Sequence, residues 1–191
     1  MKRLCTTLVL LVILTTSAFA NDKLALKASI GYARWIPVGA SYDNNRGAGC
    51  LLGKFLFYNL SPTTSIGIES GFFFWGRAKG EFEDGTPWEE TKTSIPFFLI
   101  AHFKIAGDEE GLSYYLDLGI GAQGVRRTRV KGNGTGGGVF IGLLATPGVE
   151  IYLSPTLKLD IFVEIQCLTE LELGGGGEAI LMVIPSAGIR F

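Results

Sequence analysis

Apolar and polar residues alternate along most of this chain, so that every second side chain is hydrophobic. A period of two residues is the period of a β-strand whose two faces meet different environments. Eight segments follow this pattern: Lys23–Trp35, Cys50–Tyr58, Ser65–Trp75, Thr93–Ala106, Ser113–Val125, Val139–Leu153, Leu157–Gln166 and Ala179–Phe191. The pattern therefore predicts an all-β protein of eight strands.

The connections between these segments alternate in length. The connections Asn59–Thr64, Gly107–Gly111 and Ser154–Thr156 are short, whereas the other four are long and either polar or rich in glycine. Short turns at one end and long loops at the other are typical of barrels that cross an outer membrane. We therefore expect an eight-stranded antiparallel up-and-down transmembrane β-barrel.

Alternation alone does not say which face of the strands lies inside the barrel. A soluble lipocalin-like ligand carrier has an apolar interior, whereas a membrane barrel has an apolar outer surface. The interior of eight strands is just wide enough for side chains to fill, and the apolar faces here carry too many Leu, Ile and Phe residues to fit there. This favours the membrane barrel.

The charged residues of the segments fall on the opposite, inward face, and their signs balance. An unpaired buried charge is costly, so a narrow lumen requires such pairing. We expect a plugged lumen in which basic and acidic side chains neutralise one another, with His102 as a further hydrogen-bonding member. The expected network consists of Lys27, Lys54, Lys104, Lys158 and Arg190 with Glu69, Asp117, Glu150, Asp160 and Glu164.

The first twenty residues have the features of an export signal. Lys2 and Arg3 precede the short apolar run Leu8–Leu14, and Ala18-Phe19-Ala20 is a small-x-small cleavage site. We therefore expect a signal peptide at residues 1–20 and a barrel domain at residues 21–191. Without Lys2 and Arg3 the chain keeps 15 basic against 18 acidic residues, which gives no reason to expect nucleic acid binding.

The final segment, Ile184-Pro-Ser-Ala-Gly-Ile-Arg-Phe191, resembles the last strand of bacterial outer-membrane barrels, which typically ends in Phe. The segments Ser94–Ile100, Tyr115–Gly121 and Gly148–Asp160 are similar to segments of the OmpA-like and outer membrane protein beta-barrel domain families. The resemblance implies a location in the bacterial outer membrane, contact with its lipid and lipopolysaccharide, and Phe191 as a signal for the barrel-assembly machinery. It does not imply the tethering of outer membrane to cell wall, because no peptidoglycan-binding domain is expected.

Few residues suggest chemistry. Gly119–Gly124 matches G-x-G-x-x-G but lacks the helix and the acidic residue that a dinucleotide site requires. His102 has no neighbouring nucleophile in the sequence, and the cysteines lack metal-ligand spacing. Cys50 and Cys167 are expected to face opposite sides of strands that are not neighbours, so no disulfide is expected. We expect no catalytic, cofactor-binding or metal-binding residues.

A basic cluster, Arg126, Arg127, Arg129 and Lys131, is placed by the pattern in the third long loop, and the second long loop, Arg77–Lys92, is acidic. The basic cluster is either a solvated surface or a contact for anionic lipopolysaccharide. The two loops are hypothesised to pair across the barrel mouth. Three functions stay open: a non-enzymatic barrel that is structural or interacts through its loops, a lipid A-modifying membrane enzyme, and a soluble lipocalin-like carrier.

Overall fold

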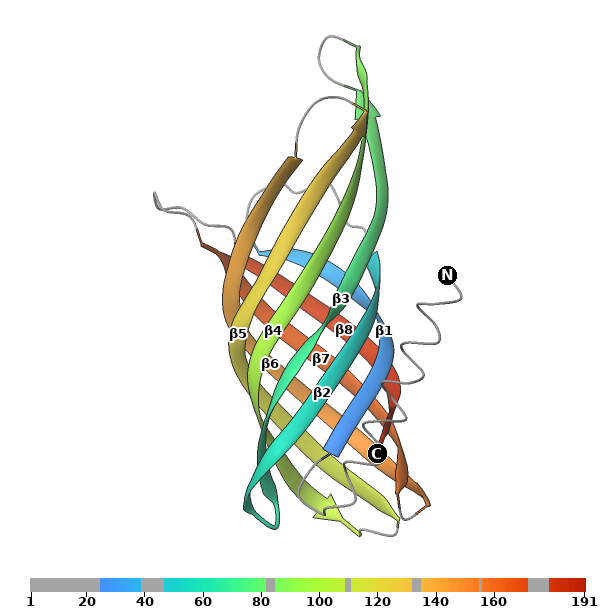
Figure 1. The fold of residues 1–191 in the computed structure, drawn as a ribbon, viewed down its shortest axis with the longest axis vertical. Helices are drawn as coiled ribbons and strands as arrows, with labels where there is room; N and C mark the ends of the chain where they lie inside the picture. The colour runs from blue at the N-terminus through green and yellow to red at the C-terminus, as the bar shows by residue number, and fades with distance from the viewer. Residues whose placement is uncertain are drawn as a thin grey trace.

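The computed structural model describes residues 25–38, 47–81, 85–108, 111–131, 135–154, 156–171 and 179–191. They form eight strands: β1 (Ala25–Val38), β2 (Gly47–Ser61), β3 (Thr64–Glu81), β4 (Pro87–Gly107), β5 (Leu112–Lys131), β6 (Thr135–Ser154), β7 (Leu157–Glu170) and β8 (Ala179–Arg190). Each strand pairs antiparallel with the next, and β8 pairs with β1 to close the barrel (Figure 1). The predicted fold class is confirmed. The expected signal peptide lies outside the described residues.

The outer surface of the barrel is apolar. Outward side chains such as Ile30, Ile120 and Leu143 are exposed, whereas their neighbours along each strand are buried. A soluble protein rarely exposes a continuous apolar surface of this size, and a lipocalin-like carrier requires the opposite arrangement. The described residues contain no helix long and apolar enough to cross a membrane.

Four neighbouring strands are longer than the rest. Strands β3 to β6 have 18, 21, 20 and 20 residues, whereas the other four have 12 to 15. Figure 1 shows that the extra length rises beyond the remaining strands at the long-loop end. The strand pairing there joins Arg77 to Thr91, Lys131 to Glu89 and Thr128 to Thr135.

These extensions correct two loop assignments. Most of the segment Arg77–Lys92 belongs to β3 and β4, and the basic cluster Arg126, Arg127, Arg129 and Lys131 belongs to β5 rather than to a loop. Beyond the apolar belt both faces of a sheet can meet water, so strands persist through backbone hydrogen bonds without an apolar alternation. The period-two signal that locates a strand in sequence is therefore missing there.

The interior is divided into two parts along the barrel axis. Most of the charged side chains lie in the half nearer the short turns, whereas the half nearer the long loops is mainly apolar, with buried Glu89, Ser94 and Gln123 among its apolar side chains. This apolar part was not expected from the sequence, which suggested a lumen of glycines and paired charges. The apolar part consists of Leu52, Phe73, Trp75, Phe98, Val125, Phe140, Leu144, Leu168, Ile180, Met182 and Ile184.

Inward glycines let the strands approach one another closely. A Cβ atom at Gly142 would overlap the carbonyl oxygen of Cys167 on β7, and one at Gly121 would overlap the carbonyl oxygen of Phe97 on β4. These positions tolerate no side chain, as expected where glycine allows close backbone approach within a sheet.

Candidate functional site

Lys54 is the centre of the charged part of the lumen. It extends from β2, is almost completely buried, and its Nζ lies 2.9 Å from Oε2 of Glu69 on the adjacent strand β3. The same Nζ lies 2.9 Å from Oδ2 of Asp117 on β5 and 3.7 Å from Oε2 of Glu164 on β7. One cation therefore holds carboxylates from three strands, and the attraction is strong because water is excluded.

Glu150 on β6 is the second centre, closer to the short turns. The Nη1 atom of Arg190 donates to Oε1 at 2.6 Å and to Oε2 at 2.8 Å. Lys27 Nζ lies 2.8 Å from Oε1, and Lys158 Nζ lies 3.6 Å from Oε2. Here one carboxylate is shared by three cations, the reverse of the arrangement around Lys54.

Two aromatic residues connect these centres. The Tyr115 hydroxyl donates to Oδ1 of Asp160 at 2.6 Å, and Lys27 Nζ lies 3.8 Å from the centre of the Tyr115 ring. His102 Nδ1 lies 2.6 Å from Oδ1 of Asp117, and its ring centre lies 5.0 Å from that of Tyr115. The two centres therefore form one continuous network.

Every strand contributes to this lumen network. Its members by strand are Lys27 (β1), Lys54 (β2), Glu69 (β3), His102 (β4), Tyr115 and Asp117 (β5), Glu150 (β6), Lys158, Asp160 and Glu164 (β7), and Arg190 (β8). The structure thus brings together ten residues expected from the sequence. The eleventh, Lys104, lines the adjoining cavity.

The sequence interpretation missed Tyr115 and Gln166. Gln166 Nε2 donates to Oε1 of Glu164 at 2.5 Å, so it completes the surroundings of a buried carboxylate. Both residues share the inward parity of Asp117 and Glu164, and that parity was the available signal. Formal charge alone does not identify such neutral partners.

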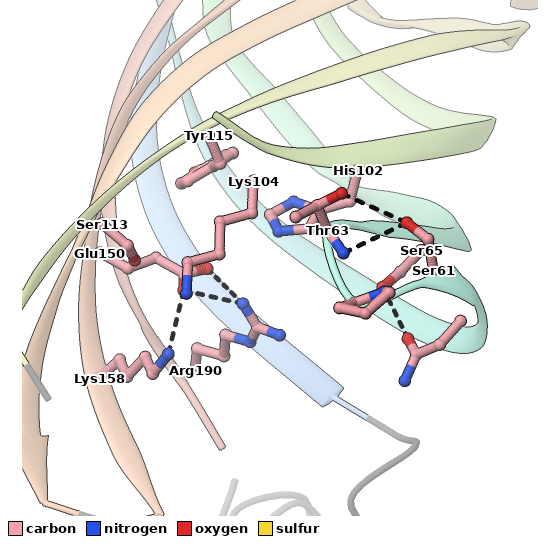
Figure 2. A pocket seen from close by; sticks show the side chains of 12 residues that line it. Ser61, Thr63, Ser65, His102, Lys104, Ser113, Tyr115, Glu150, Lys158 and Arg190 are labelled. Carbon is pink, nitrogen blue, oxygen red and sulfur yellow. Dashed lines mark hydrogen bonds and ion pairs between the residues drawn. The ribbon is translucent and has the colours of Figure 1, made fainter. Parts of the chain in front are cut away.

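A cavity of about 200 Å³ lies below the network at the short-turn end. Figure 2 shows the cationic side chains of Lys158 and Arg190 on one side of it and the hydroxyl groups of Ser61, Thr63 and Ser65 on the other. The cavity therefore gives the short-turn end a polar vestibule. The apolar part of the lumen lies between this vestibule and the long loops.

The network consists of ion pairs and hydrogen bonds between its own members. His102 is engaged by Asp117, and the other described residues place no hydrogen-bonded serine or cysteine nucleophile on its ring. Within the described ranges, no group of three or more His, Cys, Asp or Glu side chains is arranged to hold a metal ion. Gly119–Gly124 lies inside β5 between two strands, where the helix that a dinucleotide motif requires is replaced by sheet.

The two cysteines lie on opposite faces of the barrel wall. Cys50 on β2 is buried on the inward face, whereas Cys167 on β7 is exposed on the outer surface, and both thiols are free. This agrees with the expectation that no disulfide joins them.

The basic cluster and the acidic residues of β4 lie on neighbouring strands. In the β4–β5 register Glu89 is opposite Lys131, Glu90 is opposite Arg129, and Thr93 is opposite Arg126. Glu89 and Glu90 therefore lie beside the basic cluster within the sheet. Glu83 and Asp84 lie outside the described residues, so the hypothesised pairing of the two loops across the barrel mouth stays a prediction. The side chain of Arg126 is exposed on the outer surface of β5.

An apolar outer surface around an ion-paired lumen, in a closed sheet of eight antiparallel strands, defines a barrel of the small outer-membrane type. The structure of Neisserial surface protein A (NspA) is similar to this chain with a TM-score of 0.62 and 14% identity, over 88% of this chain and 96% of that one. Ail, the attachment invasion locus protein of Yersinia pestis, in complex with the heparin analogue sucrose octasulfate, is similar with a TM-score of 0.50 and 19% identity, over 88% and 99%. At these identities the similarity establishes the fold. Neither a protein-family model nor a curated protein sequence matches the chain.

Proposed function

We propose that this chain is an integral protein of the bacterial outer membrane that has no enzymatic activity and acts as a structural or surface-interacting barrel. The observation that carries the proposal is the combination of an apolar outer surface with buried ion pairs across the lumen. An apolar belt on the outside suits lipid. A filled interior suits neither a wide pore nor a ligand carrier.

The surface that interacts is the long-loop end, where β3 to β6 rise beyond the other strands. The basic cluster of Arg126, Arg127, Arg129 and Lys131 lies there and attracts polyanions by long-range electrostatics. Lipopolysaccharide is the abundant polyanion of the outer leaflet, so it is the partner we propose. The complex of Ail with a sulfated heparin analogue is an instance of polyanion binding by a barrel of this fold.

Lipid A modification, the second function class, has no observation in its favour. Hydrolysis requires a nucleophile beside a base, whereas His102 is buried in the lumen and paired with Asp117. Lipid approaches from the outside of the barrel wall. The lumen network therefore serves stability rather than chemistry.

Insertion through the barrel-assembly machinery, with Phe191 as the recognised residue, completes the proposal. Phe191 extends β8 at the short-turn end and carries on the backbone pairing with β1. Phe191 lies where β8 pairs with β1, so we expect it to guide the closure of the sheet into a barrel.

Fractionation of cells and a gel-shift assay test the location. We expect the protein in the outer-membrane fraction, extracted only by detergent, and migrating differently on gels before and after heating. Recovery as a soluble periplasmic protein would overturn the proposal.

Binding of purified barrel in micelles to lipopolysaccharide tests the partner. Neutralising the basic cluster (Arg126→Gln, Arg127→Gln, Arg129→Gln, Lys131→Gln) should weaken binding and reduce its dependence on salt. The matched control neutralises the neighbouring acids, Glu89→Gln and Glu90→Gln, and should bind at least as well as the unaltered protein. Equal binding by all three proteins would contradict a role for the basic cluster.

A further inference from the structure

A groove of about 560 Å³ lies at the long-loop end of β4, β5 and β6. Ile95, Gly124 and Val139 are consecutive partners in the strand register, and all three lie on the outward face. Phe72 of β3 closes one side. The groove is therefore a depression in the outer surface of the wall; Ser94 and Val125, whose side chains are buried, also contribute to its lining.

Gly124 forms the floor of this depression. A Cβ atom built on Gly124 would meet no other atom within 4 Å, whereas Ile95 and Val139 stand on either side with about half of their surface exposed. Most outward positions of the apolar belt carry Leu, Ile or Phe, so a glycine between two branched residues leaves a gap. The gap is wide and apolar enough to accept a hydrocarbon chain.

Arg126 stands at the upper rim of the groove. It lies two residues beyond Gly124 on the same face of β5, a distance of about 6–7 Å along the strand. Its backbone partners there are Thr93 and Gly137, which also line the groove. The exposed guanidinium of Arg126 thus lies directly beyond the apolar part of the groove.

This juxtaposition matches the two parts of an anionic lipid. We propose that the groove binds one acyl chain of a phosphate-bearing outer-leaflet lipid, with the lipid's phosphate on Arg126. Guanidinium groups hold phosphate by paired hydrogen bonds, and burial of the chain on Ile95 and Val139 supplies the apolar contribution. The inference rests on the proposed outer-membrane location and names a particular site for the lipid contact.

Two substitutions test the site separately. Gly124→Leu fills the groove without any change of charge, and Arg126→Gln removes the phosphate contact without any change in the floor. The matched controls are Gly49→Leu, another outward glycine with nothing within 4 Å of its Cβ position, and Arg34→Gln, an exposed arginine on β1. A heat-dependent gel shift verifies that each variant is folded.

The probe is lipid A, added to purified barrels in micelles and counted by native mass spectrometry. We expect Gly124→Leu and Arg126→Gln each to lower lipid A retention about tenfold, the loss of one good charge-assisted contact or its apolar equivalent, and both controls to retain lipid A like the unaltered protein. Unchanged retention by Gly124→Leu would overturn the groove. Loss of lipid A by Gly124→Leu but not by Arg126→Gln would remove the phosphate from the proposal.

Failure here is distinct from failure of the proposed function. A protein found in the outer membrane that loses lipopolysaccharide binding when the basic cluster is neutralised, yet is unaffected by Gly124→Leu, would keep the function and lose only the groove. Recovery of the chain as a soluble periplasmic protein would overturn both the proposed function and the lipid-binding groove.

Discussion

Leu26 and Phe191 exchange two backbone hydrogen bonds across the seam of the barrel. The Phe191 N–H donates to the Leu26 carbonyl at 2.9 Å, and the Leu26 N–H donates to the Phe191 carbonyl at 3.3 Å. The pairing of β8 with β1, and hence the closure of the sheet, continues to Phe191.

Deletion of Phe191 should lower the amount of protein inserted in the outer membrane while leaving export intact. It removes the two hydrogen bonds to Leu26, each with a net contribution of about 0.5–1.5 kcal/mol, together with the proposed assembly signal. Immunoblots of periplasmic and outer-membrane fractions measure the effect. Phe191→Tyr keeps the backbone and an aromatic ring and should insert normally; normal insertion of the deletion variant would weaken the proposal.

Substitution of Lys54 by Met should destabilise the folded barrel strongly. It leaves the buried carboxylates of Glu69, Asp117 and Glu164 without their common cation, and breaking a buried pair in this way costs about 3–5 kcal/mol. Urea unfolding in micelles, followed by tryptophan fluorescence, gives the free energy of unfolding.

Lys158→Met is the control for this experiment. The Lys158 side chain is 25% exposed and its Nζ lies 3.6 Å from Glu150, so solvent screens the pair and the expected loss is below about 1 kcal/mol. Adding Glu69→Gln and Glu164→Gln to Lys54→Met should restore part of the stability. Equal losses for Lys54→Met and Lys158→Met would contradict the central role of Lys54.

Alanine at Gly142 should destabilise the barrel, whereas alanine at Gly124 should not. A Cβ atom at Gly142 would overlap the Cys167 carbonyl oxygen and one at Gly124 would meet open space. Overpacking of this kind typically costs about 1–3 kcal/mol. The same unfolding assay compares the two variants. Similar stabilities would mean that β6 and β7 are less closely packed than the contact between Gly142 and the Cys167 carbonyl oxygen indicates.

The thiols should differ sharply in reactivity. A membrane-permeable maleimide should label Cys167, which is exposed on the outer surface, and should leave buried Cys50 unlabelled until the barrel is unfolded. Mass spectrometry of protein labelled before and after denaturation measures this difference, with Cys167→Ser as the control. Rapid labelling of Cys50 in the folded protein would show that the lumen opens.

No steady ion conductance is expected across planar bilayers that contain the purified barrel. Phe73, Phe98 and Ile184 are fully buried in the apolar part of the lumen, where we expect them to block the passage of ions. A steady open level that scales with salt concentration would contradict the plug.

The fold could be predicted from the sequence because the apolar belt requires a hydrophobic residue at every second position of each strand. Lipid outside and a narrow lumen inside require strict alternation, so residues such as Leu157–Gln166 identify both a strand and its faces. Beyond the belt this constraint ends. The alternation therefore predicts a loop at Arg126 and the other members of the basic cluster, although backbone pairing with β4 keeps them in a strand.

The members of the lumen network were readable from their parity, but their pairing was not. Lys54 on β2 meets Asp117 on β5 and Glu164 on β7, strands that are not its neighbours in the sheet. Such contacts across the lumen depend on the stagger of the strands and on the lengths of side chains. Neither is encoded in the alternation of a single strand.

The lumen network, with a member on every strand, has a consequence for register. A strand that slips by two residues keeps its apolar face outside. Contact with lipid therefore does not disfavour the slipped strand. The same slip moves each inward charge by about 6–7 Å, far more than the 2.6–3.7 Å that separate the paired atoms. The ion pairs therefore favour the native register, because a barrel with a slipped strand would enclose unpaired charges.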